Sequence, residues 1–149
     1  MSGVADSART GAVLYVFADD HGPPHVHARH RGDAWTARIR FSFVVPAVSL
    51  VSVTPLRHAP LPRVVSGLLA DVRDDLTACR RAWWTIRRNT CLANAWVLKP
   101  PPTLTVPNRR TARCVQIDAA DFEPGSLLLH LTFKDRTKLA IEAGSGQET

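Results

Sequence analysis

The chain has 149 residues, 45% of them hydrophobic, and this composition excludes a protein that is disordered throughout. Nineteen basic residues against thirteen acidic ones give a net charge of +6. Sixteen of the basic residues are arginines, which make bidentate contacts with phosphate, so we expect nucleic acid or another acidic partner. The alternative explanation of the arginine content is a GC-rich genome.

The start of the chain lacks the features of a targeting segment. Residues 1–9 are small and polar, without the basic start and apolar run of a secretion signal, and we expect residues 1–10 to be disordered. The three cysteines form no Cys-x-x-Cys pair, and no apolar stretch approaches the length of a membrane span. These features favour a cytoplasmic, bacterial-type protein that does not contact membranes.

The first half of the chain predicts strands. Residues 11–18 are rich in β-branched and aromatic side chains and predict a first strand, which stops at residues 19–22. A second strand is expected over residues 25–30, then a hairpin turn in which Gly32 supplies a positive φ, then a returning strand over residues 34–43. Residues 44–55 contain Pro46, which predicts an edge strand or an irregular one.

The second half predicts a helix and a smaller group of strands. Residues 63–89 place apolar side chains three and four positions apart, as one long amphipathic helix does. The proline-rich residues 93–112 predict a linker or an extended arm. Beyond the arm, strands are expected at residues 113–118, 127–133 and 138–142, and residues 144–149 are expected to fray.

Together these elements predict an α+β fold. The main domain, residues 11–92, is expected to pack an antiparallel β-sheet on one long amphipathic helix. The arm then tethers a C-terminal β-hairpin unit of residues 113–143.

Four of the six histidines fall within ten residues, at positions 21, 25, 27 and 30. Two prolines precede His25, and they favour an extended backbone there. Because side chains alternate along an extended chain, His25 and His27 should point to one face and His30 to the other. The first of these faces is the expected place for chemistry.

Two interpretations of the cluster compete. In the first, His25 and His27 join Asp19 or Asp20 to hold a divalent ion, zinc or manganese, with a position left open for water. In the second, the histidines are hydrogen-bonded side chains of a half-buried strand, and residues 19–24 are a turn. A His-x-His pair alone does not decide between them.

Five arginines are the expected contacts for nucleic acid. Arg38 and Arg40 lie on the polar side of the returning strand, and Arg29 lies on the histidine strand. Arg87 and Arg88 lie in the last turn of the predicted helix, near Trp83 and Trp84. Guanidinium groups at these positions would contact phosphates.

Residues 15–29 carry a resemblance to a known family. They run from Tyr-Val-Phe-Ala into Asp-Asp-His-Gly-Pro-Pro-His-Val-His-Ala-Arg. An aromatic strand that leads into Asp-His-x-Pro-Pro-His-x-His is the hallmark of a bacterial family known as domain of unknown function 4160, which the chain resembles over roughly residues 11–89. Gly67-Leu68 departs from this family, which often has a tryptophan there. The resemblance implies that Asp20, His21, His25 and His27 form its signature and are the candidate metal ligands.

Residues 113–143 resemble a second uncharacterised family, domain of unknown function 2442, through the strand and turn at residues 129–136. Arg136 stands where that family has a glycine. Members of the two families are often encoded side by side and have been proposed as toxin and antitoxin modules. The resemblance implies a fusion of the two, with a cognate antitoxin as one expected partner.

Two classes of function follow from these observations. The first is a nucleic-acid-directed protein of toxin–antitoxin type, such as a small metal-dependent or histidine-based ribonuclease. In it His25, His27 or His21 would act as general acid or base while Arg29, Arg38 or Arg40 steadied phosphate charge. The second is a non-catalytic, dimeric binding or regulatory module that pairs with a second copy of itself through exposed strands.

Overall fold

The computed structural model describes residues 2–99 and 103–149, and the chain divides into two compact units. The first unit contains the residues up to 41 and residues 47–87, and the second contains residues 42–46 and 88–149. Strands and helices are both present, which confirms the predicted α+β class. Within the described ranges, no helix is both long and apolar enough to cross a lipid bilayer.

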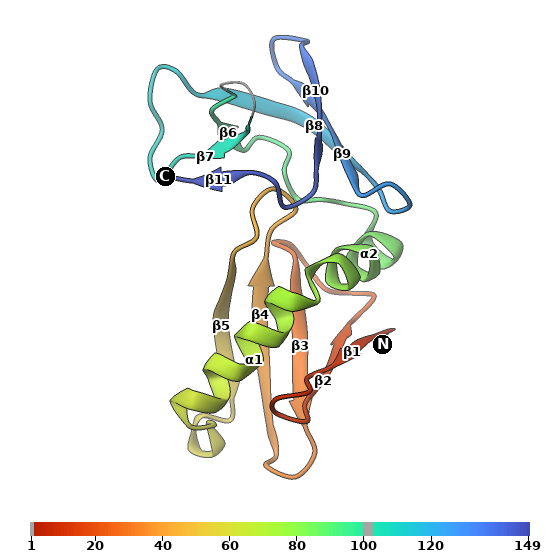
Figure 1. Ribbon diagram of the computed structural model, residues 1–149, viewed down its shortest axis with the longest axis vertical. Coiled ribbons are helices and arrows are strands. Elements are labelled where there is room, and N and C mark those ends of the chain that lie inside the picture. The colour runs from red at the N-terminus through yellow and green to blue at the C-terminus, as the bar shows by residue number, and fades with distance from the viewer. Residues whose placement is uncertain (1, 100–102) are drawn as a thin grey trace. The chain divides into compact units, whose positions relative to one another are not determined.

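The first unit is built on a five-stranded antiparallel sheet in which each strand pairs with its neighbours in sequence (Figure 1). The strands are β1 (Ser2–Asp6), β2 (Val13–Val16), β3 (His25–His30), β4 (Trp35–Phe41) and β5 (Val48–Thr54). The last four confirm the predicted strands, and β5 occupies the edge that was expected for it. The meander places β3 in the middle of the sheet.

The β3–β4 turn differs from its prediction at one position. Gly32 does not take the positive φ that was expected, whereas Ala34 has a φ of 55°. The turn covers residues 31–34, and its last residue takes the left-handed conformation, as in hairpin loops in which an αL residue follows a type I turn.

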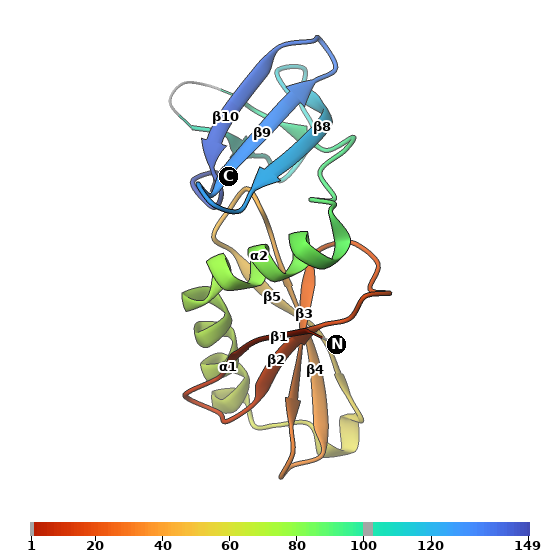
Figure 2. The same ribbon diagram turned by 90° about the vertical axis from the view of Figure 1, so that its right-hand side faces the viewer.

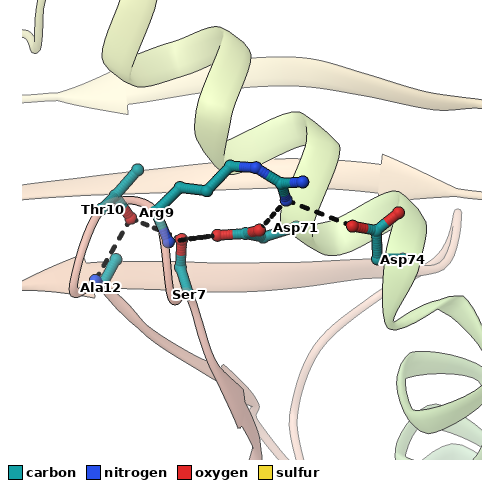
Figure 3. Close-up of polar contacts among 6 residues, drawn as sticks. All are labelled: Ser7, Arg9, Thr10, Ala12, Asp71 and Asp74. Carbon is teal, nitrogen blue, oxygen red and sulfur yellow. Dashed lines mark hydrogen bonds and ion pairs between the residues drawn. The ribbon is translucent and has the colours of Figure 1, made fainter.

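The N-terminal residues, expected to be disordered, form β1, which pairs antiparallel with β2. The turn between β1 and β2 is held by the buried carboxylate of Asp71 on the first helix (Figure 3). Asp71 accepts hydrogen bonds from the Ser7 hydroxyl, at 2.5 Å, from the Arg9 backbone N–H, at 2.9 Å, and from the Arg9 guanidinium. This long-range anchor is invisible in the composition of residues 1–10.

The predicted long helix is two helices, α1 (Pro62–Asp74) and α2 (Leu76–Arg87), which follow a short 3₁₀ turn, η1 (Leu56–His58). The chain changes direction at Asp75, where φ is −103° and ψ is 19° (Figure 2). The apolar period continues across the break, because Leu68 and Val72 are buried on α1 and Cys79 and Trp83 on α2. Each helix buries its own stripe, against β5 for α1 and against β1, β2 and β3 for α2.

The core of the first unit lies between the helices and one face of the sheet. Leu14, Val26 and Ile39, from three adjacent strands, are completely buried on this inner face. The opposite, outer face carries the residues that alternate with them, among which Arg29, Arg38 and Arg40 are exposed. The histidine strand β3 therefore presents one apolar side to the core and one polar side outward.

The second unit has a four-stranded sheet in the order β10-β9-β8-β6 and a two-stranded parallel pair, β11 and β7. The bounds are β6 (Trp96–Val97), β7 (Thr105–Val106), β8 (Val115–Glu123), β9 (Leu128–Phe133), β10 (Lys138–Glu142) and β11 (Gln147–Glu148). The three predicted strands are confirmed, with β8 longer than expected. In the β9–β10 turn, Arg136 takes a φ of 71°, a conformation that favours glycine.

Two segments of the second unit are more ordered than the sequence indicated. The proline-rich arm contributes β6 and β7, and Leu104 is buried beside β7; residues 100–102 of the Lys-Pro-Pro-Pro run lie outside the described residues. The tail, expected to fray, forms β11 on β7. Gly146 explains this order, because its N–H donates to the Val44 carbonyl at 2.8 Å and its backbone packs closely against residues 44 and 104.

We expect Asp71→Asn to lower the free energy of unfolding by about 1–3 kcal/mol, because a buried acceptor of several hydrogen bonds loses its charge. Asp74→Asn is the matched control, since the Asp74 side chain is 66% exposed, and its effect should stay within about 0.5 kcal/mol. Urea unfolding of the three proteins measures both changes. Equal stabilities of the two variants would contradict the anchor.

The pH dependence gives a second readout of the same anchor. Burial favours the neutral form of Asp71, but the bonds from Ser7 and Arg9 outweigh it and lower the pKa of the carboxyl. The stabilisation is therefore complete above the unfolded carboxyl pKa of about 3.9 and is lost as the pH falls through the lower folded value. The gap between wild type and Asp71→Asn should close in this acidic range.

We also expect Gly146→Ala to destabilise the second unit by about 1–3 kcal/mol, since overpacking forces neighbouring atoms apart. A Cβ at position 146 would lie 2.6 Å from Val44 Cγ1 and 2.8 Å from the Val44 carbonyl oxygen. At Gly125, in an exposed turn, a Cβ would meet nothing within 4 Å, so Gly125→Ala is the control. Thermal unfolding of both variants tests the expectation, which fails if their midpoints coincide.

Candidate metal centre

Three predicted site residues come together at the start of β3. Asp20 lies in the loop after β2, and His25 and His27 are the first and third residues of β3. The two imidazole rings lie on the same side of the strand, 5.1 Å apart between centroids, as the alternation of side chains predicts. One ligand atom from each of Asp20, His25 and His27 lies within 4.8 Å of the others.

The Asp20 carboxylate is held by the backbone of its own loop. Its Oδ2 accepts the Phe17 N–H at 2.8 Å, while the Asp20 N–H donates to the Phe17 carbonyl at 3.2 Å. The Arg87 guanidinium at the end of α2 donates to the Ala18 carbonyl at 2.6 Å. These bonds leave Oδ1 of Asp20 pointing at the two histidines.

The distances from Asp20 to the two histidines match the spacing of metal ligands. Asp20 Oδ1 lies 2.9 Å from His27 Nε2 and 3.4 Å from His25 Nε2. Ligand atoms about 2.0–2.2 Å from a common ion, at octahedral to tetrahedral angles, lie roughly 2.9–3.5 Å apart. All three ligand atoms lie within 4.8 Å of one another, so the group can close on an ion by bringing the two histidines nearer to each other.

In neutral His25, the ring nitrogen that faces the group carries no hydrogen. His25 Nδ1 lies 2.9 Å from the Pro23 carbonyl oxygen, which can only accept, so Nδ1 carries the hydrogen. In a neutral imidazole, Nε2 is then a lone pair. This atom is buried, and among the residues that the structure describes it has no hydrogen-bond partner. In this tautomer two acceptors, His25 Nε2 and Asp20 Oδ1, lie 3.4 Å apart, and a positive charge between them would stabilise both.

The surroundings of the group are aromatic. The Tyr15 ring stacks on His27, the Phe17 ring meets it edge to face, and Trp83 packs against His25 at 5.3 Å. The side chains of Asp20, His25 and His27 are 7–9% exposed. Burial raises the pKa of Asp20, but the bonds from His27 and Phe17 and the charge of the imidazoles outweigh it and lower the pKa, so the carboxyl stays ionised.

Other predicted site residues lie outside the group. Asp19 and His21 are exposed and are not members of the cluster, so Asp20 is the carboxylate that reaches it. His30 stacks on Trp35 instead, and its Nδ1 accepts the Asp33 N–H. The coarse prediction of an Asp/His/His group that can hold a metal is confirmed.

The five arginines that were predicted to contact nucleic acid do not all lie on one surface. Arg40 is the cross-strand partner of His25, and Arg38 is that of His27, so both arginines share the outer face with the histidines. Arg29 lies on this face too, two residues beyond His27. Arg87 is engaged with the loop, and Arg88 belongs to the second unit.

Sequence analysis missed the parts of the site that orient its ligands. The Pro23 carbonyl, the Phe17 N–H and the Arg87 guanidinium act through backbone geometry or across 69 positions of sequence. The first two had a signal, because an aspartate or a proline in a turn often forms local backbone hydrogen bonds. The role of Arg87 had none.

Comparison with known proteins leaves the site to be interpreted from its geometry. No family model, curated protein or solved structure matches the chain. The resemblance of residues 11–89 and 113–143 to two uncharacterised families stays a prediction.

Proposed function

We propose that Asp20, His25 and His27 bind a divalent ion, zinc or manganese, and that the protein acts on nucleic acid with this site. The observation that carries the proposal is His25 Nε2, which is buried, has no hydrogen-bond partner among the described residues and lies 3.4 Å from the Asp20 carboxylate. A bound cation would satisfy both acceptors at once. The His25 Nδ1–H bond to a backbone carbonyl supports this, because metal-ligating histidines commonly make such a bond.

The chemistry that such an ion supplies suits phosphodiesters. Three protein ligands leave coordination positions for water or a phosphate oxygen, and a divalent ion acidifies bound water and withdraws charge from phosphate. The set of two histidines and one carboxylate fits zinc or manganese better than calcium, which prefers oxygen ligands throughout. A small metal-dependent ribonuclease of toxin–antitoxin type is the activity we favour.

Nucleic acid is the favoured substrate because of the charges beside the group. Arg38 and Arg40 are exposed next to His27 and His25. Within the described part of the chain, no carboxylate lies within 4.0 Å of either guanidinium. These charges are therefore available for phosphates.

A dimeric, non-catalytic module is the second candidate, and strand β5 favours it. This edge strand carries no charged residue, and Leu50 and Val51 are 37% and 49% exposed on it. Natural edge strands are usually protected by charges, so an unprotected one suits pairing with a second copy. Nucleic-acid binding without cleavage in the experiment below would support this module.

Metal analysis of the untagged protein tests the site. We expect about one equivalent of zinc or manganese per chain by plasma mass spectrometry, lost in His25→Ala/His27→Ala and retained in the control His58→Ala/His130→Ala, which removes two exposed histidines. Circular dichroism checks that both variants fold. A wild-type protein that takes up neither ion from buffered solutions would refute the metal site.

Incubation of the metal-loaded protein with single-stranded RNA tests the activity. We expect His25→Ala to slow cleavage by at least about 100-fold, the usual size of the contribution of a catalytic histidine or metal ligand, and chelation to have the same effect. His58→Ala should cleave like wild type. RNA that stays intact with and without divalent ions would rule out the ribonuclease.

A further inference from the structure

A hollow of about 370 Å³ opens beside the β3–β4 hairpin. Tyr15, Arg29, Arg31, Trp35 and Thr36 contribute to its lining. A smaller adjoining hollow shares Tyr15, Arg29 and Arg31. Tyr15 belongs to both places, since its ring stacks on His27 at 5.4 Å while its side chain lines the hollow.

The charge of this hollow is positive. Arg29 and Arg31 are both exposed, and within residues 2–99 and 103–149 neither makes an ion pair with a carboxylate. The nearby Asp33 is engaged with His30, whose Nδ1 lies 3.4 Å from the carboxylate. Two guanidinium groups that share one hollow without a counter-ion suit an oxyanion that accepts several hydrogen bonds.

Neutral donors line the same hollow. Tyr15 and Thr36 both line it, and each carries a hydroxyl that can donate a hydrogen bond.

We propose that this hollow binds one phosphate group of a single-stranded nucleic acid. The neighbouring phosphate of the same strand would then reach the metal. The proposal rests on the proposed function, because it places the substrate relative to Asp20, His25 and His27. Arg29 lies two residues beyond His27 on the same face of β3, so the Cα atoms of the two residues are about 6.6 Å apart. Successive phosphates of an extended single strand have a similar spacing, so one phosphate can occupy the hollow while its neighbour approaches the metal group.

Binding of a labelled oligouridine, measured by fluorescence anisotropy over a range of salt concentrations, tests the hollow. Each phosphate neutralised in a single strand contributes about 0.7 to the slope of log affinity against log salt, so Arg29→Ala/Arg31→Ala, which removes the contacts to the one phosphate in the hollow, should reduce the slope by about 0.7. The control Arg57→Ala/Arg73→Ala removes two exposed arginines and the same charge from another part of the first unit. Its slope should match wild type.

Titration with inorganic phosphate gives a readout that does not depend on nucleic acid. The ¹H–¹⁵N resonance of the Thr36 backbone amide, in a residue that lines the hollow beside Arg29, should shift in wild type and stay in place in Arg29→Ala/Arg31→Ala. Equal slopes of the two double variants, a Thr36 resonance that phosphate does not move, or binding of a phosphorylated peptide tighter than that of the single strand would each overturn the proposal.

The failure of this inference can be told apart from failure of the metal site. Arg29→Ala/Arg31→Ala should keep the metal content of wild type, because neither arginine belongs to the ligand group. If the metal is present and the slope is unchanged, only the phosphate hollow is wrong. If the slope falls as expected in a protein that holds no ion, only the metal site is wrong.

Discussion

The first unit depends on how one carboxylate, that of Asp20, is shared. One oxygen is taken by the Phe17 N–H, which closes the loop, and the other faces two histidines. His27 can donate to that oxygen, but neutral His25 cannot, because its single hydrogen is on Nδ1 and is donated to the Pro23 carbonyl. The loop, the strand and the tautomer therefore combine to leave a place for one positive charge.

A comparison with the second buried carboxylate of the unit shows why this arrangement is unusual. Asp71 is met by Ser7 and by the Arg9 guanidinium, so its charge is balanced within the protein and its role is to hold the N-terminal turn. For Asp20, no lysine or arginine within the described residues lies at ion-pair distance. A buried negative charge without a permanent cation is costly, and a bound ion would remove that cost.

The outer face of the sheet connects the candidate site with its proposed substrate. Antiparallel pairing puts Arg38 and Arg40 opposite the histidines, and the period of β3 puts Arg29 on the same side. The inner face is apolar and is used for packing against the helices, so the polar side chains of these strands gather on one surface. This separation lets a small domain keep its core intact while the surface close to Asp20, His25 and His27 carries charge.

The sequence by itself determined the elements whose patterns are local. Strands β2–β5 and β8–β10, and the shared face of His25 and His27, follow from apolar runs, turns and side-chain alternation over a few residues. Tertiary structure decided the rest, because it depends on contacts between distant segments. Asp71 orders β1 across more than 60 positions, Gly146 lets the tail pair with β7, and separate packing of α1 and α2 bends the helix at Asp75.

The same division applies to the candidate site. Its two histidines could be chosen from the sequence, and the family resemblance pointed to Asp20, whereas only the fold of the loop places Asp19 and His21 outside the group. In a turn, the direction of each side chain depends on backbone dihedrals that residue type does not determine, and the hydrogen bonds of Phe17 and Arg87 select the one that points inward.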